Sequence, residues 1–224
     1  DGFQPRAGVA AAEAFDTRPG SIDARTRHHE IAGMRVALLP KKNRGETVVV
    51  SLRLPSGDAE SLFNQRFVEM LTGQMLMRGT TRYTRAQLQD ELVRLKVTGG
   101  VNGRSGSFET TRANVAEAIR LMAHVLREPS FPAAELEQLR NLLVTSIESQ
   151  RSDPAARAGE VLGQHFNQHP RGDMRYSPTL QEQLDGVKAV TLDDLRRFHR
   201  TFYGADRALV SVVGDFDEAE VLRA

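Results

Sequence analysis

Residues 47–80 read TVVVSLRLPSGDAESLFNQRFVEMLTGQMLMRGT and contain the change of pattern that decides the fold. The first part, residues 47–54, is rich in β-branched residues and is typical of a strand that ends at a Pro-Ser-Gly-Asp turn. From residue 59 to residue 77 the apolar residues recur every three or four positions, which predicts an amphipathic helix. We expect the apolar face of this helix to lie on a sheet; its members are Phe63, Phe67, Met70, Leu71 and Met75.

The flanking sequence supplies more strands. Residues 31–39 alternate as a strand should, and a turn over residues 40–45 would pair them antiparallel with residues 47–54. Two short strand-like runs lie within residues 97–110, around Gly99-Gly100 and Gly103-Arg104, and a last strand is predicted over residues 208–213.

Helical periodicity fills most of the remainder. We predict helices over residues 84–95, 114–127, 133–150, 154–168, 180–187 and 192–203. This order of strands and helices indicates an α+β fold in which helices cover one face of a mostly antiparallel sheet. Residues 1–20, rich in Ala, Gly and Pro, are predicted to be a linker, and residues 21–224 one domain. The first residue is Asp1 and not Met, so we interpret the chain as a piece of a longer protein.

The amino-acid composition argues against several classes of binding partner and of chemistry. The 224 residues carry 30 Lys and Arg against 29 Asp and Glu, a net charge of +1. Such a balance gives no broad field to attract nucleic acid or an anionic membrane, and we expect neither as a partner. The chain has no cysteine, which excludes disulfides, thiolate nucleophiles and Cys-ligated zinc. No apolar run approaches the roughly 20 residues that a membrane span needs.

Five segments, in this order and spacing, resemble the insulinase/pitrilysin family of zinc peptidases. They are Leu38-Leu39-Pro40-Lys41 with Leu54-Pro55-Ser56-Gly57, Met75-Leu76-Met77-Arg78-Gly79-Thr80, Phe131-Pro132 with Asp153-Pro154, Thr191-Leu192-Asp193-Asp194-Leu195 with Phe202-Tyr203, and Val213-Gly214-Asp215-Phe216. The resemblance implies a metallohydrolase-type unit of the insulinase and mitochondrial-processing-peptidase kind. It also implies that the parent protein is a zinc metalloendopeptidase.

The family's catalytic motif is degenerate in this chain. In an active member, H-x-x-E-H precedes the Arg-Gly-Thr ending, with two histidines that bind zinc and a glutamate that acts as base. The resemblance places Met70, Gly73 and Gln74 at these positions, and Ser146 at the third ligand, or Glu148 after a slip of two residues. A thioether, a bare backbone and an amide cannot do the original work. We therefore expect no catalytic residue and no metal in this chain, with zinc held by a catalytic half elsewhere.

The resemblance thus implies an inactive domain, the first unit of a non-catalytic repeat. Its expected role is to contribute to a peptide-binding chamber and to pack on the catalytic half, on the same chain or on a partner subunit. The alternative is a freestanding structural or assembly protein with the same fold and no part in proteolysis. Bacterial relatives of this kind are often exported, so the expected compartment is the periplasm, with the cytoplasm as the alternative.

Two further groups of residues are candidates for binding. The run Gly99, Gly100, Val101 and Asn102 is similar to the glycine-rich edge strand that pairs with the peptide substrate in active relatives. The alternative is a glycine-loosened edge strand that binds nothing. His165 and His169 have the i, i+4 spacing of a metal pair, but Pro170 follows at once, so we favour helix-end histidines over a new metal centre.

Overall fold

The computed structural model describes residues 12–55 and 57–224 of the chain. The first eleven of the residues predicted to be a linker therefore lie outside the described part. Within the same predicted linker the structure has the start of a short helix, α1 (Pro19–Arg25), which the sequence pattern did not predict. Pro19 occupies the first turn of this helix, where the missing N–H of proline costs nothing.

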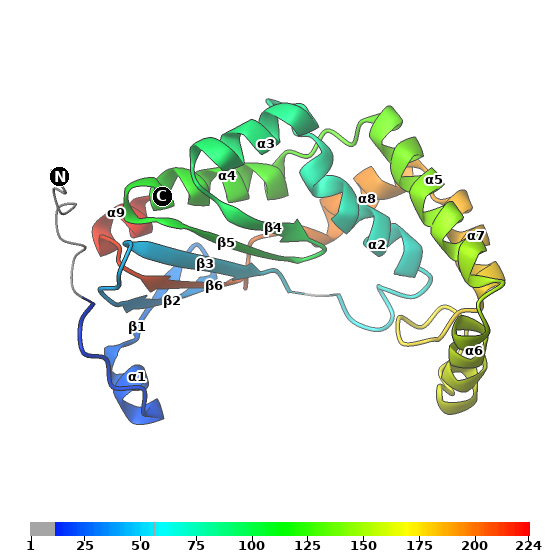
Figure 1. The fold of residues 1–224 in the computed structure, drawn as a ribbon, viewed down its shortest axis with the longest axis horizontal. Coiled ribbons are helices and arrows are strands. Elements are labelled where there is room, and N and C mark those ends of the chain that lie inside the picture. The colour runs from blue at the N-terminus through cyan, green and yellow to red at the C-terminus, as the bar shows by residue number, and fades with distance from the viewer. Residues whose placement is uncertain (1–11, 56) are drawn as a thin grey trace, which may run out of the picture.

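A six-stranded sheet forms the centre of the fold (Figure 1). The strands lie in the order β1-β2-β6-β3-β5-β4, and every neighbouring pair is antiparallel except β2 with β6. Their bounds are Arg27–Ile31 (β1), Met34–Pro40 (β2), Thr47–Arg53 (β3), Thr98–Asn102 (β4), Ser105–Thr111 (β5) and Leu209–Gly214 (β6). The mostly antiparallel sheet of the prediction is confirmed.

Two predictions about the first strands were wrong. The run over residues 31–39 is interrupted by a turn at Ala32 and Gly33, both with positive φ, so that β1 ends where the predicted strand began. The predicted pairing of residues 31–39 with residues 47–54 does not occur, because β6 lies between β2 and β3 and bonds to both. A strand from the far end of the chain thus replaces the local partner.

Helices α3 (Arg85–Arg94), α4 (Val115–Arg127) and α9 (Glu218–Arg223) pack on one face of the sheet. The largest core cluster joins them to alternate strand residues, among which Leu38, Val48, Val50, Phe108 and Val212 are almost fully buried. On the other face, alternate residues remain 36% to 41% exposed; these are Val49, Leu209 and Val213. The prediction that helices cover one face is confirmed.

The helix predicted over residues 59–77 is shorter than expected and packs elsewhere. Helix α2 runs from Arg66 to Met75 and continues as a 3-10 turn, η1 (Leu76–Arg78). Asn64 has φ of +61°, which is not a helical conformation, so the helix cannot extend back to residue 59. Phe63, on the predicted apolar face, is 45% exposed. The buried apolar side chains of α2, Leu71 and Met75, belong to a cluster with residues of other helices and not with the sheet. The predicted contact of this face with the sheet was therefore wrong.

Helix α2 packs against a layer of helices that lies beside the sheet. This layer comprises α5 (Ala133–Gln150), α7 (Leu180–Ala189) and α8 (Leu192–Phe202), with α6 (Pro154–Phe166) at the far end (Figure 1). Two smaller clusters hold this layer together, one around Leu71, Leu139 and Leu195 and one around Ile147 and Leu184.

Helix starts follow the chemistry of their first residues. Thr84, Thr179 and Thr191 each form a capping box, and the Asp153 side chain accepts a hydrogen bond from the backbone N–H of Ala155. These caps satisfy N–H groups that the first turn of a helix leaves free.

The two faces of β3 predict a contrast between neighbouring valines. Val50→Ala should lower the free energy of unfolding by about 2–3 kcal/mol, because it removes buried methyl groups and leaves a cavity. Val49→Ala, one residue earlier on the open face, should cost no more than about 1 kcal/mol. Urea unfolding of both variants measures the difference. Equal losses would contradict the assignment of the two faces.

Candidate functional site

The positions that the family resemblance aligns with the zinc motif lie together on α2, but each meets a different environment. Met70 is half-buried and packs against the two apolar clusters that join α2 to α5, α7 and α8. Its thioether therefore fills a gap between helices, as methionine often does.

Gly73 is buried against the turn between β4 and β5. A Cβ atom built on Gly73 would lie 2.4 Å from the backbone N of Gly103 and 2.5 Å from its Cα atom. Both distances are far below van der Waals contact, and both neighbours are backbone atoms that cannot rotate away. The turn thus lies directly on the helix backbone, and no side chain can begin at residue 73 unless the turn moves.

The remaining motif positions offer no ligands either. Gln74 is half-buried on α2, and Ser146 is exposed on α5. The carbonyl oxygen of Ser146 accepts hydrogen bonds from Ser149 Oγ at 2.8 Å and from Gln150 Nε2 at 3.2 Å. Within residues 12–55 and 57–224, no group of three or more His, Cys, Asp or Glu is placed to hold a metal ion. The residues at the motif positions therefore do not fit a zinc ion.

A small polar cluster fixes the β4–β5 turn in this place. The Tyr203 hydroxyl, just after α8, donates a hydrogen bond of 2.9 Å to the carbonyl oxygen of Gly103. Glu69 on α2 forms an ion pair with Arg104, and the two side chains are only 17% and 11% exposed. The second carboxylate oxygen of Glu69 and Nη1 of Arg104 are buried and have no hydrogen-bond partner among the described residues.

Burial shifts the pKa values of Tyr203, a member of this cluster, and of the neighbouring His199. Burial raises the pKa of the Tyr203 phenol well above its usual value, so the hydroxyl remains a donor at neutral pH. His199 stacks on Tyr203 with ring centroids 4.8 Å apart, and burial lowers its pKa. His199 Nε2 lies 2.7 Å from the carbonyl oxygen of Leu126, which can only accept, so Nε2 carries the proton.

The predicted edge-strand residues all lie on β4, at the margin of the sheet (Figure 1). Val101 is buried and packs on the core, whereas Gly99 and Asn102 are exposed. Gly99 has φ of +112°, and a Cβ atom there would lie 2.1 Å from the carbonyl oxygen of Ser107, so only glycine fits. A Cβ atom on Gly100 would meet nothing within 4 Å. The strand therefore offers mainly backbone at this edge.

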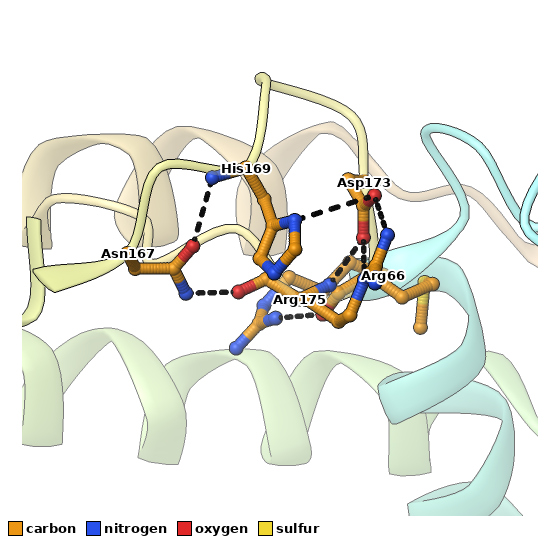
Figure 2. Close-up of polar contacts among 6 residues, drawn as sticks. Arg66, Asn167, His169, Asp173 and Arg175 are labelled. Carbon is orange, nitrogen blue, oxygen red and sulfur yellow. Dashed lines mark hydrogen bonds and ion pairs between the residues drawn. The ribbon is translucent and has the colours of Figure 1, made fainter.

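The two candidate metal histidines do not share a helix face. Helix α6 ends at Phe166, close to where the following proline predicted an end, so His165 is helical and His169 lies in the loop beyond. Figure 2 shows His169 beside Asn167 and Asp173. The backbone N–H of His169 donates to Asn167 Oδ1 at 3.1 Å, and its Nδ1 is 4.0 Å from Asp173. The same loop is tied to α2, because Arg66 donates to the carbonyl oxygen of Met174 at 2.6 Å.

Sequence reasoning missed the cluster of Glu69, Arg104 and Tyr203. Glu69 directly precedes Met70, and Arg104 directly follows the turn glycine Gly103. The only signal in the sequence was that one charged residue lies next to a motif position and another next to a turn glycine. Their contact could not be predicted, because it depends on how α2 packs against the hairpin. The sequence placed Tyr203 only in a motif at the end of a helix.

The close approach predicts that alanine at residue 73 is destabilising. Gly73→Ala should lower the free energy of unfolding by about 1–3 kcal/mol, the usual cost of overpacking, although alanine is the better helix former. The matched control is Gly159→Ala on α6, where a Cβ atom meets nothing within 4 Å. This control should stabilise the protein by about 0.4–1 kcal/mol. Thermal or urea unfolding compares the two, and equal shifts would show that the turn does not press on α2.

Comparison with known proteins finds sequence similarity to one family of peptidases. A family model described as the peptidase M16 inactive domain matches residues 189–224. The zinc protease PqqE of Helicobacter pylori is 24% identical over 200 residues, which are 84% of this chain and 43% of that protein. The chain thus spans less than half the length of this curated relative.

Solved structures agree on the fold. The peptidase M16 inactive domain from Pseudomonas fluorescens has a TM-score of 0.73 at 20% identity, over 88% of this chain and 49% of that chain. The periplasmic protease PqqL from Escherichia coli has a TM-score of 0.69 at 16% identity, over 95% of this chain and 24% of that chain. The chain is therefore similar in sequence and in fold to M16 zinc peptidases, and its residues 189–224 match the model of that family's inactive domain.

Proposed function

We propose that this domain holds an extended peptide along β4 while a separate, zinc-bearing catalytic half cuts it. The observation that carries the proposal is the position of β4 at the edge of the sheet, beside a motif region where the described residues provide no metal ligands. Substrate holding and bond cleavage would then be divided between two domains. In the catalytic half, zinc would supply an activated water and polarise the scissile carbonyl.

The backbone of β4 suits strand addition. An edge strand has free N–H and C=O groups on its outer side, and an incoming peptide can pair with them at every second residue. Gly100 has open space around it, so a peptide can approach closely there. Because the hydrogen bonds come from backbone, this mode of binding would accept many peptide sequences.

The partners and the location follow from the same relatives. Solved M16 relatives are about twice or four times as long as the part this chain matches, which leaves room for a catalytic half. We assign residues 21–224 to the first unit of a non-catalytic repeat and residues 1–20 to the segment that precedes it. PqqL is described as periplasmic, and this supports a periplasmic location here, with the cytoplasm as the alternative. Among the described residues, no helix has the length and apolarity to cross a bilayer.

Activity should depend on the other half. The isolated chain, with or without added zinc, should cleave no fluorogenic peptide, because positions 70, 73 and 74 provide no zinc ligand and no base. Mixing with the catalytic half, or expression of the complete protein, should give cleavage that a chelator abolishes. Peptide hydrolysis by the isolated, zinc-free chain would overturn the assignment. A complete protein without H-x-x-E-H and without activity would favour a structural or assembly role instead.

Peptide binding along β4 can be tested with a single thiol. Residues 1–224 contain no cysteine, so Gly100→Cys in the complete protein gives this part of the chain one thiol, on the strand that is proposed to pair with the peptide. A decapeptide with a central cysteine activated by thionitrobenzoate should be captured as a mixed disulfide, with release of the coloured thiolate. The rate should exceed that of Gly20→Cys on α1, also an open position, by about tenfold through local concentration.

The peptide itself supplies the second control. The same decapeptide with N-methylated backbone amides cannot pair as a strand, so its capture by Gly100→Cys should fall to the Gly20→Cys rate. Equal rates for the two thiols with the unmodified peptide would contradict binding at β4.

A further inference from the structure

The turn that joins β4 to β5 is held from three directions. Below it lies the bare backbone of Gly73 on α2, so close that a Cβ atom there would be 2.4 Å from Gly103 N. From the side, the Tyr203 hydroxyl donates to the Gly103 carbonyl at 2.9 Å. The carbonyl of Arg104 accepts a hydrogen bond of 2.8 Å from the backbone N–H of Leu54, after β3. These contacts fix the end of β4 relative to α2, α8 and β3.

The ion pair of Glu69 with Arg104 adds a fourth, directional contact. Both side chains are largely buried, and one oxygen of Glu69 and one nitrogen of Arg104 have no hydrogen-bond partner among the described residues. A buried pair with incomplete hydrogen bonding is a poor source of stability, because desolvation offsets most of the attraction. Its geometry is nevertheless specific, since it joins α2 to the residue that follows the turn. The pair is therefore better suited to fixing position than to adding stability.

We propose that Tyr203 and the Glu69–Arg104 pair are positioning residues that hold the β4–β5 turn in the space a motif glutamate would need, and so set the place of the edge strand for a peptide. The proposal rests on the proposed function, because the edge strand it positions is the one assigned to peptide binding. It also gives the degenerate motif a structural role. The hairpin packs directly on the backbone of residue 73, and this contact requires a residue without a side chain.

The first experiment removes one hydroxyl. In Tyr203→Phe, hydrogen exchange of the amides of residues 99–104 in the complete protein should become about three- to tenfold faster, because the turn loses one hydrogen bond. Tyr83→Phe makes the same deletion at a half-buried tyrosine that packs on the sheet core, and it should leave exchange in this segment unchanged. Unchanged exchange in Tyr203→Phe would overturn the role of Tyr203.

The second experiment separates position from stability. Glu69→Met with Arg104→Met removes the pair without leaving a buried charge, so unfolding in urea should be unchanged or should require more urea. If the pair positions the edge, exchange over residues 99–104 should still accelerate, and peptide capture by Gly100→Cys in this background should fall about three- to tenfold. If the double variant leaves both the exchange rate of residues 99–104 and the rate of peptide capture unchanged, the pair does not position the edge strand, and the proposal would be wrong.

The two readouts also separate this inference from the proposed function. If Gly100→Cys captures peptide no faster than Gly20→Cys in the otherwise unchanged protein, peptide binding at β4 is refuted. Exchange over residues 99–104 then still decides whether the cluster holds the turn, since it needs no peptide. Faster exchange in both Tyr203→Phe and the double methionine variant supports the positioning role.

Discussion

The contact between two glycine backbones, Gly73 on α2 and Gly103 in the β4–β5 turn, constrains much of this domain. Gly73 has no Cβ atom, so the hairpin approaches the helix more closely than a side chain at residue 73 would permit, whereas a Cβ atom on Gly103 would meet nothing within 4 Å. Gly103 also has positive φ, as the tight turn requires. Because the turn cannot shift away from α2, the end of β4 is placed relative to the helical layer, and the edge of the sheet lies beside the degenerate motif.

Local patterns were enough to predict most elements, and nonlocal pairing was not predictable from them. Thr84 and Thr191 begin helices because their side chains cap free N–H groups, a property that the nearby sequence contains. The insertion of β6 between β2 and β3 depends on a strand more than a hundred residues away, and the local turn at residues 40–45 favoured the wrong partner. The face of α2 was correctly predicted to be apolar, but periodicity does not say whether a sheet or a helix will cover it.

The site shows the same division between chemistry and geometry. The residue types at positions 70, 73 and 74 were sufficient to infer that zinc could not be bound there, since that inference needs only their functional groups. The sequence does not show whether the helical Gly73 has merely lost a catalytic side chain or is needed so that another segment can pack on the helix. Only the close approach of Gly103 distinguishes the two. The pairing of Glu69 with Arg104 was equally hidden, because it exists only when the hairpin rests on α2.

This geometry makes the three motif positions one structural unit. A glutamate at residue 73 would have to displace the hairpin, which would break the hydrogen bond from Tyr203 and separate Glu69 from Arg104, leaving two buried charges unpaired. Histidines at residues 70 and 74 alone would gain no base, and at residue 70 the imidazole would replace a thioether that fills an apolar gap between helices. No single substitution therefore leads back toward a metal site. In this domain the space beside α2 is filled by the backbone of the edge-strand hairpin, which leaves no room there for the side chain of a motif glutamate.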